Sequence, residues 1–146
     1  MILEIKLSKD AKHPLRANPT DAGLDLCALN DEILQPGMVT MVDTGVAVKI
    51  PKWHVGLLFQ RSSFTKYGIS LANAVGVIDA DYRGTIKVAF RNHAEESGYS
   101  IRKGDKIAQL VVMPIALPEL AYFNGSDEEW VDTTRGNGGF GSTGKQ

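Results

Sequence analysis

Two carboxylates stand close together in the segment Gly76–Gly84, which reads GVIDADYRG. Asp79 and Asp81 alternate there with small or apolar residues, and Tyr82 and Arg83 follow them. A carboxylate in such a place can act as a general base, and a neighbouring tyrosine ring can pack on a sugar or a base. The same pattern is also typical of a strand that enters a hairpin, with an aspartate in the turn. Taken alone, the segment leaves both interpretations open.

A second group of hydrogen-bond donors comes earlier in the chain, at Arg61-Ser62-Ser63. It follows the apolar run Val55–Phe59 and lies at the start of a possible short helix, Ser62–Tyr67. A guanidinium beside two hydroxyls can bind phosphate. The structural alternative is a helix cap, with Ser63 capping the helix and Gly68 ending it. The residues themselves do not decide between the two.

The last eleven residues, Gly136–Gln146, are rich in glycine and contain one large apolar side chain, Phe140. Such a segment cannot bury enough area to offset the entropy of ordering it, so it is predicted to be mobile. Together with Arg135, the hydroxyls of Ser142 and Thr143 and the bare backbone amides could wrap a phosphate. The ring of Phe140 could then lie flat on an aromatic ligand.

Two nucleotide-binding patterns in the same segment are coincidental. Gly136, Gly138 and Gly141 spell GxGxxG, but a dinucleotide fingerprint needs a strand before it and a helix after it. The stretch from Gly139 to Lys145 spells GxxxxGK, but Gln146 stands where a P-loop has Ser or Thr. Neither pattern predicts a nucleotide site by itself.

The elements that must position these residues are predicted to be strands. Outside the tail, glycines recur about every eleven residues, which is the spacing of turns in sandwiches and barrels. In Gly84–Asn92 apolar residues alternate with polar or small ones, as in a half-buried strand. Further strands are predicted at Ile2–Leu7, Leu24–Leu29, Met38–Ile50, Val55–Phe59 and Ile107–Val112. The fold class predicted from this pattern is an all-β sandwich or jelly roll.

Composition excludes several classes of protein. The chain has 146 residues and a formal net charge of −1, which argues against a passive nucleic-acid or anionic-membrane binder. The longest uncharged apolar stretch, Leu110–Leu117, has eight residues, too few to cross a bilayer. Cys27 is the only cysteine, and no two of the three histidines have metal-ligand spacing.

Five segments, in order along the chain, resemble the trimeric deoxyuridine triphosphate nucleotidohydrolases, the dUTPases. They are Ala22-Gly23-Leu24-Asp25-Leu26, Arg61-Ser62-Ser63, Gly76–Gly84, Gly104-Asp105-Lys106-Ile107-Ala108-Gln109 and the tail Arg135–Gly144, RGNGGFGSTG. Each segment alone is weak evidence for the family, but the five together, in the family's order and spacing, are specific evidence. The tail is the most diagnostic of the five. The resemblance implies a dUTPase-like, jelly-roll or distorted-barrel β fold, the β-clip.

The resemblance also implies an activity, the Mg²⁺-dependent hydrolysis of dUTP to dUMP and pyrophosphate. Such an enzyme keeps uracil out of DNA and supplies dUMP for dTMP synthesis. Asp79 matches the residue that activates the attacking water, which adds in line at the α-phosphorus without a covalent intermediate. Asp25 matches the acid that holds magnesium through bound waters, the metal being gripped mainly by the substrate phosphates.

Other residues match substrate contacts of the family. Asn73 would help to read uracil, in a pocket completed by the backbone of a hairpin that runs through Gly76, Val77 and Ile78 towards Lys87. The Tyr82 ring would pack on the deoxyribose and leave no room for a 2′-hydroxyl. The implied phosphate contacts are Arg61, Ser62, Ser63 and Gln109, and the implied closing-arm residues are Arg135, Phe140, Gly141, Ser142 and Thr143.

The family assembles as a homotrimer with shared active sites. For this chain, that implies a single β domain over residues 1–125 and a flexible arm over residues 126–146 that closes over a neighbouring subunit's site. The expected partner is dUTP, with no nucleic acid and no membrane. The expected location is the cytoplasm, or the host cytoplasm if the source is a virus.

Three positions depart from the family pattern, and two other functions remain to be weighed. Gln60 stands where Pro is usual, Leu24 where Tyr is common, and Lys106 where Arg is frequent. A dCTP deaminase of the same fold carries a similar Arg-Ser-Ser but attacks the base. A nucleotide-sensing module could keep the fold without turnover. The tail, and Asp79 followed by Tyr82, favour hydrolysis.

Overall fold

The computed structural model of the chain describes residues 1–130 and 133–139. The chain divides into two compact units, Met1–Ala116 and Leu117–Gln146, which are described separately. The domain boundary predicted between residues 125 and 126 falls inside the second unit and stays a prediction.

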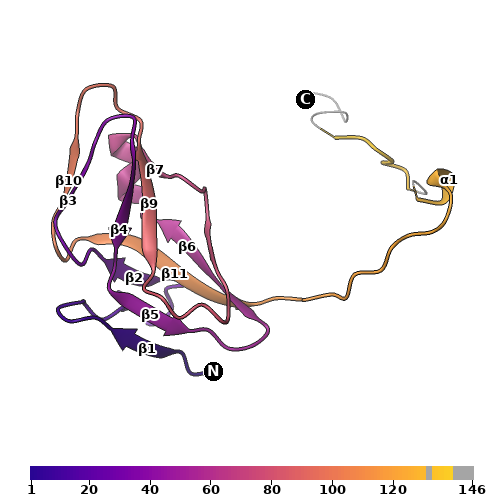
Figure 1. Cartoon of the computed structure of the whole chain (residues 1–146), viewed down its shortest axis with the longest axis horizontal. Helices are drawn as coiled ribbons and strands as arrows, with labels where there is room; N and C mark the ends of the chain where they lie inside the picture. The colour runs from indigo at the N-terminus through magenta and orange to yellow at the C-terminus, as the bar shows by residue number, and fades with distance from the viewer. Residues whose placement is uncertain (131–132, 140–146) are drawn as a thin grey trace. The chain divides into compact units, whose positions relative to one another are not determined.

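The first unit, called the body below, is built almost entirely from strands (Figure 1). Its elements are β1 (Glu4–Leu7), β2 (Leu24–Cys27), β3 (Glu32–Leu34), β4 (Val39–Asp43), β5 (Val46–Lys49), β6 (His54–Gln60), β7 (Ile69–Leu71), β8 (Gly76–Ile78), β9 (Lys87–Asn92), β10 (Tyr99–Ile101) and β11 (Lys106–Pro114), with one 3₁₀ helix, Ser62–Tyr67. The strands form antiparallel sheets in the orders β1-β5, β10-β3, β2-β11-β6-β8 and β4-β9-β7. The prediction of an all-β, jelly-roll-like fold is confirmed.

The core of the body follows the alternation predicted in the sequence. Ile86, Val88 and Phe90 are completely buried, whereas Lys87 and Arg91, which alternate with them, are exposed. Side chains alternate across a strand, so one face of β9 supplies the core and the other meets water. The ring of Phe90 stacks on Phe64 of the 3₁₀ helix, with centroids 4.9 Å apart, and this contact fixes the helix that follows β6.

Two local predictions were wrong. The predicted strand over residues 38–50 is two strands, β4 and β5, separated by a turn in which Gly45 adopts a φ of +66°. The short helix after Arg61 is present as a 3₁₀ helix, but Ser63 does not cap it. Arg61 occupies the N-cap position, without a side-chain capping hydrogen bond. Gly68 does end the helix as predicted, with a φ of +65°.

The predicted hairpin between Val77 and Lys87 is not a hydrogen-bonded hairpin. β8 pairs with β6, whereas β9 pairs with β4 and β7, so the two strands belong to different sheets. The segment that joins them therefore bridges the two sheets. Local periodicity predicts each strand but does not encode which partner it pairs with.

The described residues of the second unit include a short helix, α1 (Asp127–Trp130), which the sequence analysis did not predict. A reciprocal pair of hydrogen bonds closes its first turn: the Ser126 amide donates to Glu129 Oε2, and the Glu129 amide donates to Ser126 Oγ. The rings of Phe123 and Trp130 lie 5.0 Å apart.

Within residues 1–130 and 133–139, no helix is both long and apolar enough to cross a membrane.

Candidate functional site

Asp25 is the centre of a polar group of residues at the β2 edge of the four-stranded sheet. It lies on β2 opposite Gln109 of β11, so both side chains project from the same face. Gly23 is required next to them, because a Cβ there would come within 2.9 Å of the Gln109 Cβ and closer still to its amide oxygen. Gly23, two residues before Asp25, thus leaves room for the Gln109 side chain.

The predicted phosphate-binding residues lie beside this pair. Arg61 follows β6, and Ser62 and Ser63 are the exposed first residues of the 3₁₀ helix. The Arg61 Nε lies 3.5 Å from Asp25 Oδ1. Most of these groups face a hollow of about 320 Å³, which is lined by Ala17, Asp21, Ala22, Gly23, Asp25, Arg61, Ser62 and Gln109. Ser63 is not part of that lining. We call this hollow the anion pocket.

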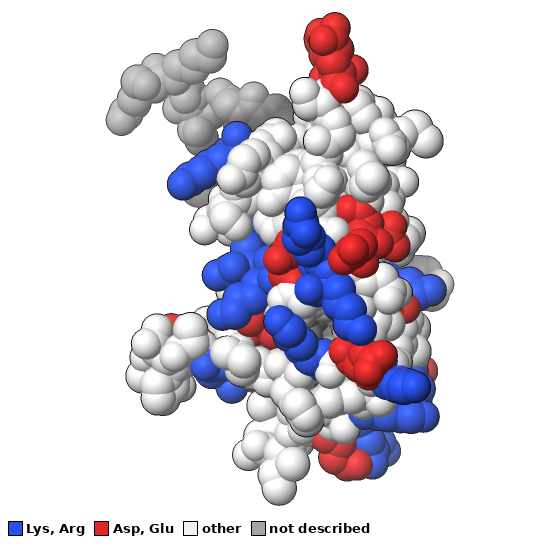
Figure 2. Space-filling model, turned by 90° about the vertical axis from the view of Figure 1, so that its left-hand side faces the viewer, with Lys and Arg blue, Asp and Glu red and all other residues white. Residues whose placement is uncertain are grey.

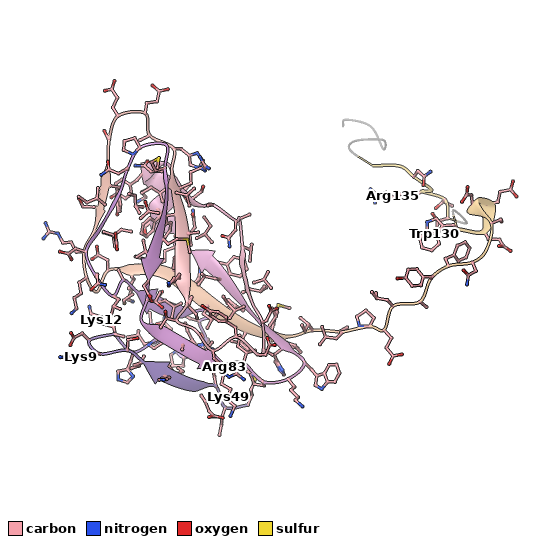
Figure 3. All side chains as sticks on the ribbon, in the orientation of Figure 1. Lys9, Lys12, Lys49, Arg83, Trp130 and Arg135 are labelled. Atoms are coloured by element: carbon pink, nitrogen blue, oxygen red, sulfur yellow. The ribbon has the colours of Figure 1, made fainter. Side chains whose placement is uncertain are left out.

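Lys106 contacts Asp25 more closely than Arg61 does, and the sequence analysis noted it only as a departure. Its Nζ lies 2.7 Å from Asp25 Oδ2. A second amine, Lys12, donates to the carbonyl of Gly104 at 3.0 Å and packs where a Cβ of that glycine would lie. Lys12 thereby secures the turn that leads into β11 and Lys106. Figure 3 labels Lys12 on the same side of the body as Lys9.

Cys27 and Gln60 lie near Lys106 at the same end of the sheet. Burial raises the pKa of the Cys27 thiol, against the opposing effect of the Lys12 cation, so the thiol stays protonated. Gln60 donates weakly from Nε2 to Thr65 Oγ1 at 3.4 Å. Its own Oε1 is the one side-chain polar atom in the described part of the chain that is buried without a hydrogen-bond partner.

Asp79 and Tyr82 occupy the turn that follows β8, at the opposite edge of the same sheet. The Tyr82 amide donates to the Asp79 carbonyl at 3.2 Å, and the Tyr82 hydroxyl donates to the Thr85 carbonyl at 3.0 Å. Gly84 makes this position of the Tyr82 ring possible, since a Cβ at residue 84 would collide with the ring. Arg83 closes the turn from outside, donating from Nη1 to the carbonyls of Ala80 at 2.8 Å and Tyr82 at 2.9 Å.

This turn is also fastened to the neighbouring sheet. Thr85 Oγ1 donates to Asp43 Oδ2 at 3.0 Å, and Asp43 Oδ1 accepts from the Gly45 amide at 2.7 Å. Asp43 is therefore a supporting residue that the sequence analysis missed, because no motif marks it. Outside the turn, Arg83 and Lys49 lie side by side and line a hollow over β1 and β5 (Figure 3).

A largely apolar hollow of about 270 Å³ lies against this turn. Its lining comprises Met41, Val77, Ile78, Asp79, Tyr82, Ile86 and Lys87. We call it the apolar pocket. Gly76 is buried in β8 behind it, where a Cβ would press on Leu58. Asn73 is exposed in the loop before β8 and is not part of the lining.

The two pockets do not meet within the body. The sheet order β2-β11-β6-β8 places three strand spacings between Asp25 and β8, roughly 14 Å. In the register of the sheet, Asp25 pairs with Gln109 of β11, which in turn pairs with Phe59 of β6. Ile78 of β8 pairs with Gly56, which lies on β6 three residues before Phe59. Asp79, one residue further, is thus displaced by about 13 Å along the strands. The two carboxylates of one chain are therefore on the order of 20 Å apart.

The predicted arm residues are described only in part. Arg135 donates from Nε to the Gly138 carbonyl at 2.8 Å, and the side chain is otherwise exposed. Phe140, Gly141, Ser142 and Thr143 lie outside the described residues, so their predicted roles stay predictions.

The charges on the body are mixed in sign. Figure 2 shows Lys and Arg side chains interspersed with Asp and Glu on the face that it presents. Two exposed ion pairs contribute to this pattern, Lys49 with Glu4 at 2.9 Å and Lys103 with Asp10 at 3.6 Å. Among the ion pairs of the described residues, those of Asp25 involve the least exposed carboxylate.

Comparison with known proteins identifies the class to which this fold and these pockets belong. The family model described as dUTPase matches residues 9–144. The chain belongs to the dUTPase family, and the prediction made from its five segments is confirmed.

Particular relatives agree with that assignment. The chain is 45% identical over 140 residues to a deoxyuridine 5'-triphosphate nucleotidohydrolase of Rhodococcus erythropolis, covering 95% of this chain and 83% of the relative. It is also 45% identical over 142 residues to the enzyme of that name from Mycolicibacterium vanbaalenii, covering 96% and 92%. Among solved structures, the Staphylococcus bacteriophage 80alpha dUTPase with dUpNHpp has a TM-score of 0.86 at 32% identity, and 99% of each chain is covered.

Proposed function

We propose that the protein hydrolyses dUTP to dUMP and pyrophosphate. One observation carries this proposal beyond the family assignment. Cationic and amide donors gather around Asp25 in one pocket, while Asp79 and the Tyr82 ring line an apolar pocket at the other edge of the sheet. The first set suits a triphosphate and the second a pyrimidine nucleoside. A similar solved structure, the phage 80alpha dUTPase, is described with the analogue dUpNHpp.

In the proposed mechanism, Asp79 takes the proton of a water that attacks the α-phosphorus in line with the leaving pyrophosphate. Water is a poor nucleophile, so a general base close to the phosphorus lowers the barrier. The guanidinium of Arg61, the hydroxyls of Ser62 and Ser63 and the Gln109 amide bind and orient the phosphates. The Tyr82 ring packs on the deoxyribose and excludes a 2′-hydroxyl by its bulk. Asn73 supplies a donor and an acceptor for uracil.

The donor groups of the anion pocket fit magnesium. In the described part of the chain, no three His, Cys, Asp or Glu residues are grouped as a metal cage. Magnesium usually keeps several waters and is held by one or two carboxylates together with substrate phosphates, so Asp25 alone is a sufficient protein partner. The bound ion would neutralise charge on the phosphate oxygens. A solved relative, a mutant dUTPase of phage phi11 of S. aureus, is described as coordinating a structural Mg(II) ion.

We also propose that the active enzyme is a homotrimer whose sites are shared between chains. A general base must act within a few ångströms of the reacting atom, about 3–3.5 Å for the attacking pair. Asp25 and Asp79 of one chain are too far apart to act on one phosphorus, and so the complete site needs a second chain. The arm, residues 126–146, is proposed to close over a neighbour's site. A cytoplasmic location is proposed because the substrate is a free nucleotide.

Product analysis with dUTP and dCTP tests the function. With Mg²⁺, we expect pyrophosphate from dUTP, little turnover of dCTP, and no ammonia. In oxygen-18-labelled water the label should enter dUMP, because attack at the α-phosphorus forms the new bond there. Ammonia release from dCTP would favour the deaminase, absence of both products a sensing module, and label in pyrophosphate would contradict the mechanism.

A further inference from the structure

Lys106 faces Asp25 because β11 contains an irregularity at that point. Lys106 is in register with Cys27 and Ala108 with Leu26, so Ile107 is an extra residue in β11, a β-bulge. Asp25 and Cys27 project from the same face of β2, and the residue opposite Cys27 projects there too. Without the bulge, Ile107 would stand opposite Cys27 in place of the lysine. Bulges often re-aim a side chain next to a functional site in this way.

The two cations on Asp25 are not equivalent. The Lys106 ammonium is 2.7 Å from Oδ2, whereas the Arg61 Nε is 3.5 Å from Oδ1. The Asp25 side chain is only 15% exposed, so loss of a close cation would leave a largely desolvated carboxylate. In the proposed function Arg61 binds phosphate. Lys106 is then the partner that holds Asp25 throughout, and Oδ1 is the oxygen left for a hydrated ion.

We propose that Lys106 is a positioning residue for magnesium, which fixes the Asp25 carboxylate so that its free oxygen can bind the hydrated ion on the triphosphate. This inference rests on the proposed function, because the ion reaches Asp25 with dUTP. Partners that orient a metal-binding group typically change metal affinity by about 10- to 100-fold when they are removed. Lys106 should therefore govern how much Mg²⁺ strengthens nucleotide binding, rather than nucleotide binding itself.

The test measures binding of dUpNHpp, the imido analogue of dUTP, by calorimetry with Mg²⁺ and with EDTA. Lys106→Met removes the charge and keeps the length of the side chain. We expect it to lower affinity on the order of tenfold with Mg²⁺ and less than about twofold with EDTA. In the Asp25→Asn background the same substitution should have no further effect, because the group that it positions is gone. Lys106→Arg should restore most of the Mg²⁺ effect.

Lys103→Met is the matched control, since it removes a nearby lysine, in the turn before β11, that pairs with Asp10 at 3.6 Å instead of Asp25. An equal loss of affinity with Mg²⁺ and with EDTA, persisting in the Asp25→Asn background, would overturn the inference and make Lys106 a direct phosphate contact. An unchanged Lys106→Met protein would overturn it as well. Failure of the wild-type protein to bind dUpNHpp would overturn both this inference and the proposed function.

Discussion

The two edges of the four-stranded sheet differ in chemistry although they belong to one element of the fold. The β2 edge places Arg61, Lys106 and Gln109 around the largely buried side chain of Asp25. The β8 edge places Val77 and Tyr82 over an apolar hollow, with Asp79 at its rim. In the proposed function, the first edge binds the phosphates of a nucleoside triphosphate and the second distinguishes its base and sugar.

In the proposed mechanism, neither edge is a complete active site by itself. In one chain the proposed base Asp79 lines only the apolar pocket, whereas Arg61, Ser62 and Gln109 line the anion pocket. On this proposal, a single chain presents two half-sites at opposite edges of its sheet. Because the halves contact different parts of the substrate, substitutions at each edge should change different ratios of kinetic constants.

Among substitutions that leave the general base Asp79 in place, the largest effect is expected at the β2 edge. Arg61→Ala should lower kcat/KM for dUTP by roughly 10- to 100-fold, because charge-assisted hydrogen bonds contribute about 1.5–3 kcal/mol each. UTP carries the same phosphates, so its kcat/KM should fall by the same factor and the dUTP/UTP ratio should not change. Steady-state kinetics with both nucleotides measures this, with Lys49→Ala as a control on an exposed ion pair. A changed ratio would mean that Arg61 also reads the nucleoside.

A smaller effect of a different kind is expected at the β8 edge. Tyr82→Ala should reduce the dUTP/UTP ratio of kcat/KM by about tenfold, since the ring no longer excludes the 2′-hydroxyl. Tyr82→Phe keeps the ring and loses only the hydrogen bond to the Thr85 carbonyl. It should preserve the ratio. If both variants lowered the ratio equally, the hydroxyl and not the ring would be responsible.

The sequence predicted the local structure of these edges better than their surroundings. Alternation identified the buried face of Ile86, Val88 and Phe90, and Gly68 marked the end of the 3₁₀ helix, because both signals are local. Strand partners depend on distant residues. The prediction of a hairpin from Val77 towards Lys87 was therefore wrong, because β8 and β9 pair with other strands.

The residues that support the proposed site were also difficult to predict from local sequence. Nothing local to Lys106 marks the bulge that turns it towards Asp25, since the bulge is defined by the register of β11 against β2. Asp43, at the end of β4, accepts a hydrogen bond from Thr85 of the segment that joins β8 to β9, and it belongs to no motif. Tyr82 and Gly84, by contrast, were marked by a motif, and the structure gives the steric reason for their pairing.

The central claim is that Asp25 and Asp79 of one active site come from different chains, and mixed assembly tests it most directly. Asp25→Asn and Asp79→Asn proteins are each prepared, and the loss of a general base alone should lower turnover by about 10²–10⁴-fold. The two are mixed in equal amounts, unfolded and refolded so that chains scramble, and the refolded trimers are assayed with dUTP and Mg²⁺.

If the two carboxylates come from different chains, a site is intact when its Asp79 comes from the Asp25→Asn protein and its Asp25 from the Asp79→Asn protein. Random assembly in a closed ring gives each condition one chance in two, so about a quarter of wild-type activity should return. If both carboxylates came from one chain, every site would keep one defect. A refolded trimeric mixture no more active than its parents would therefore contradict the account.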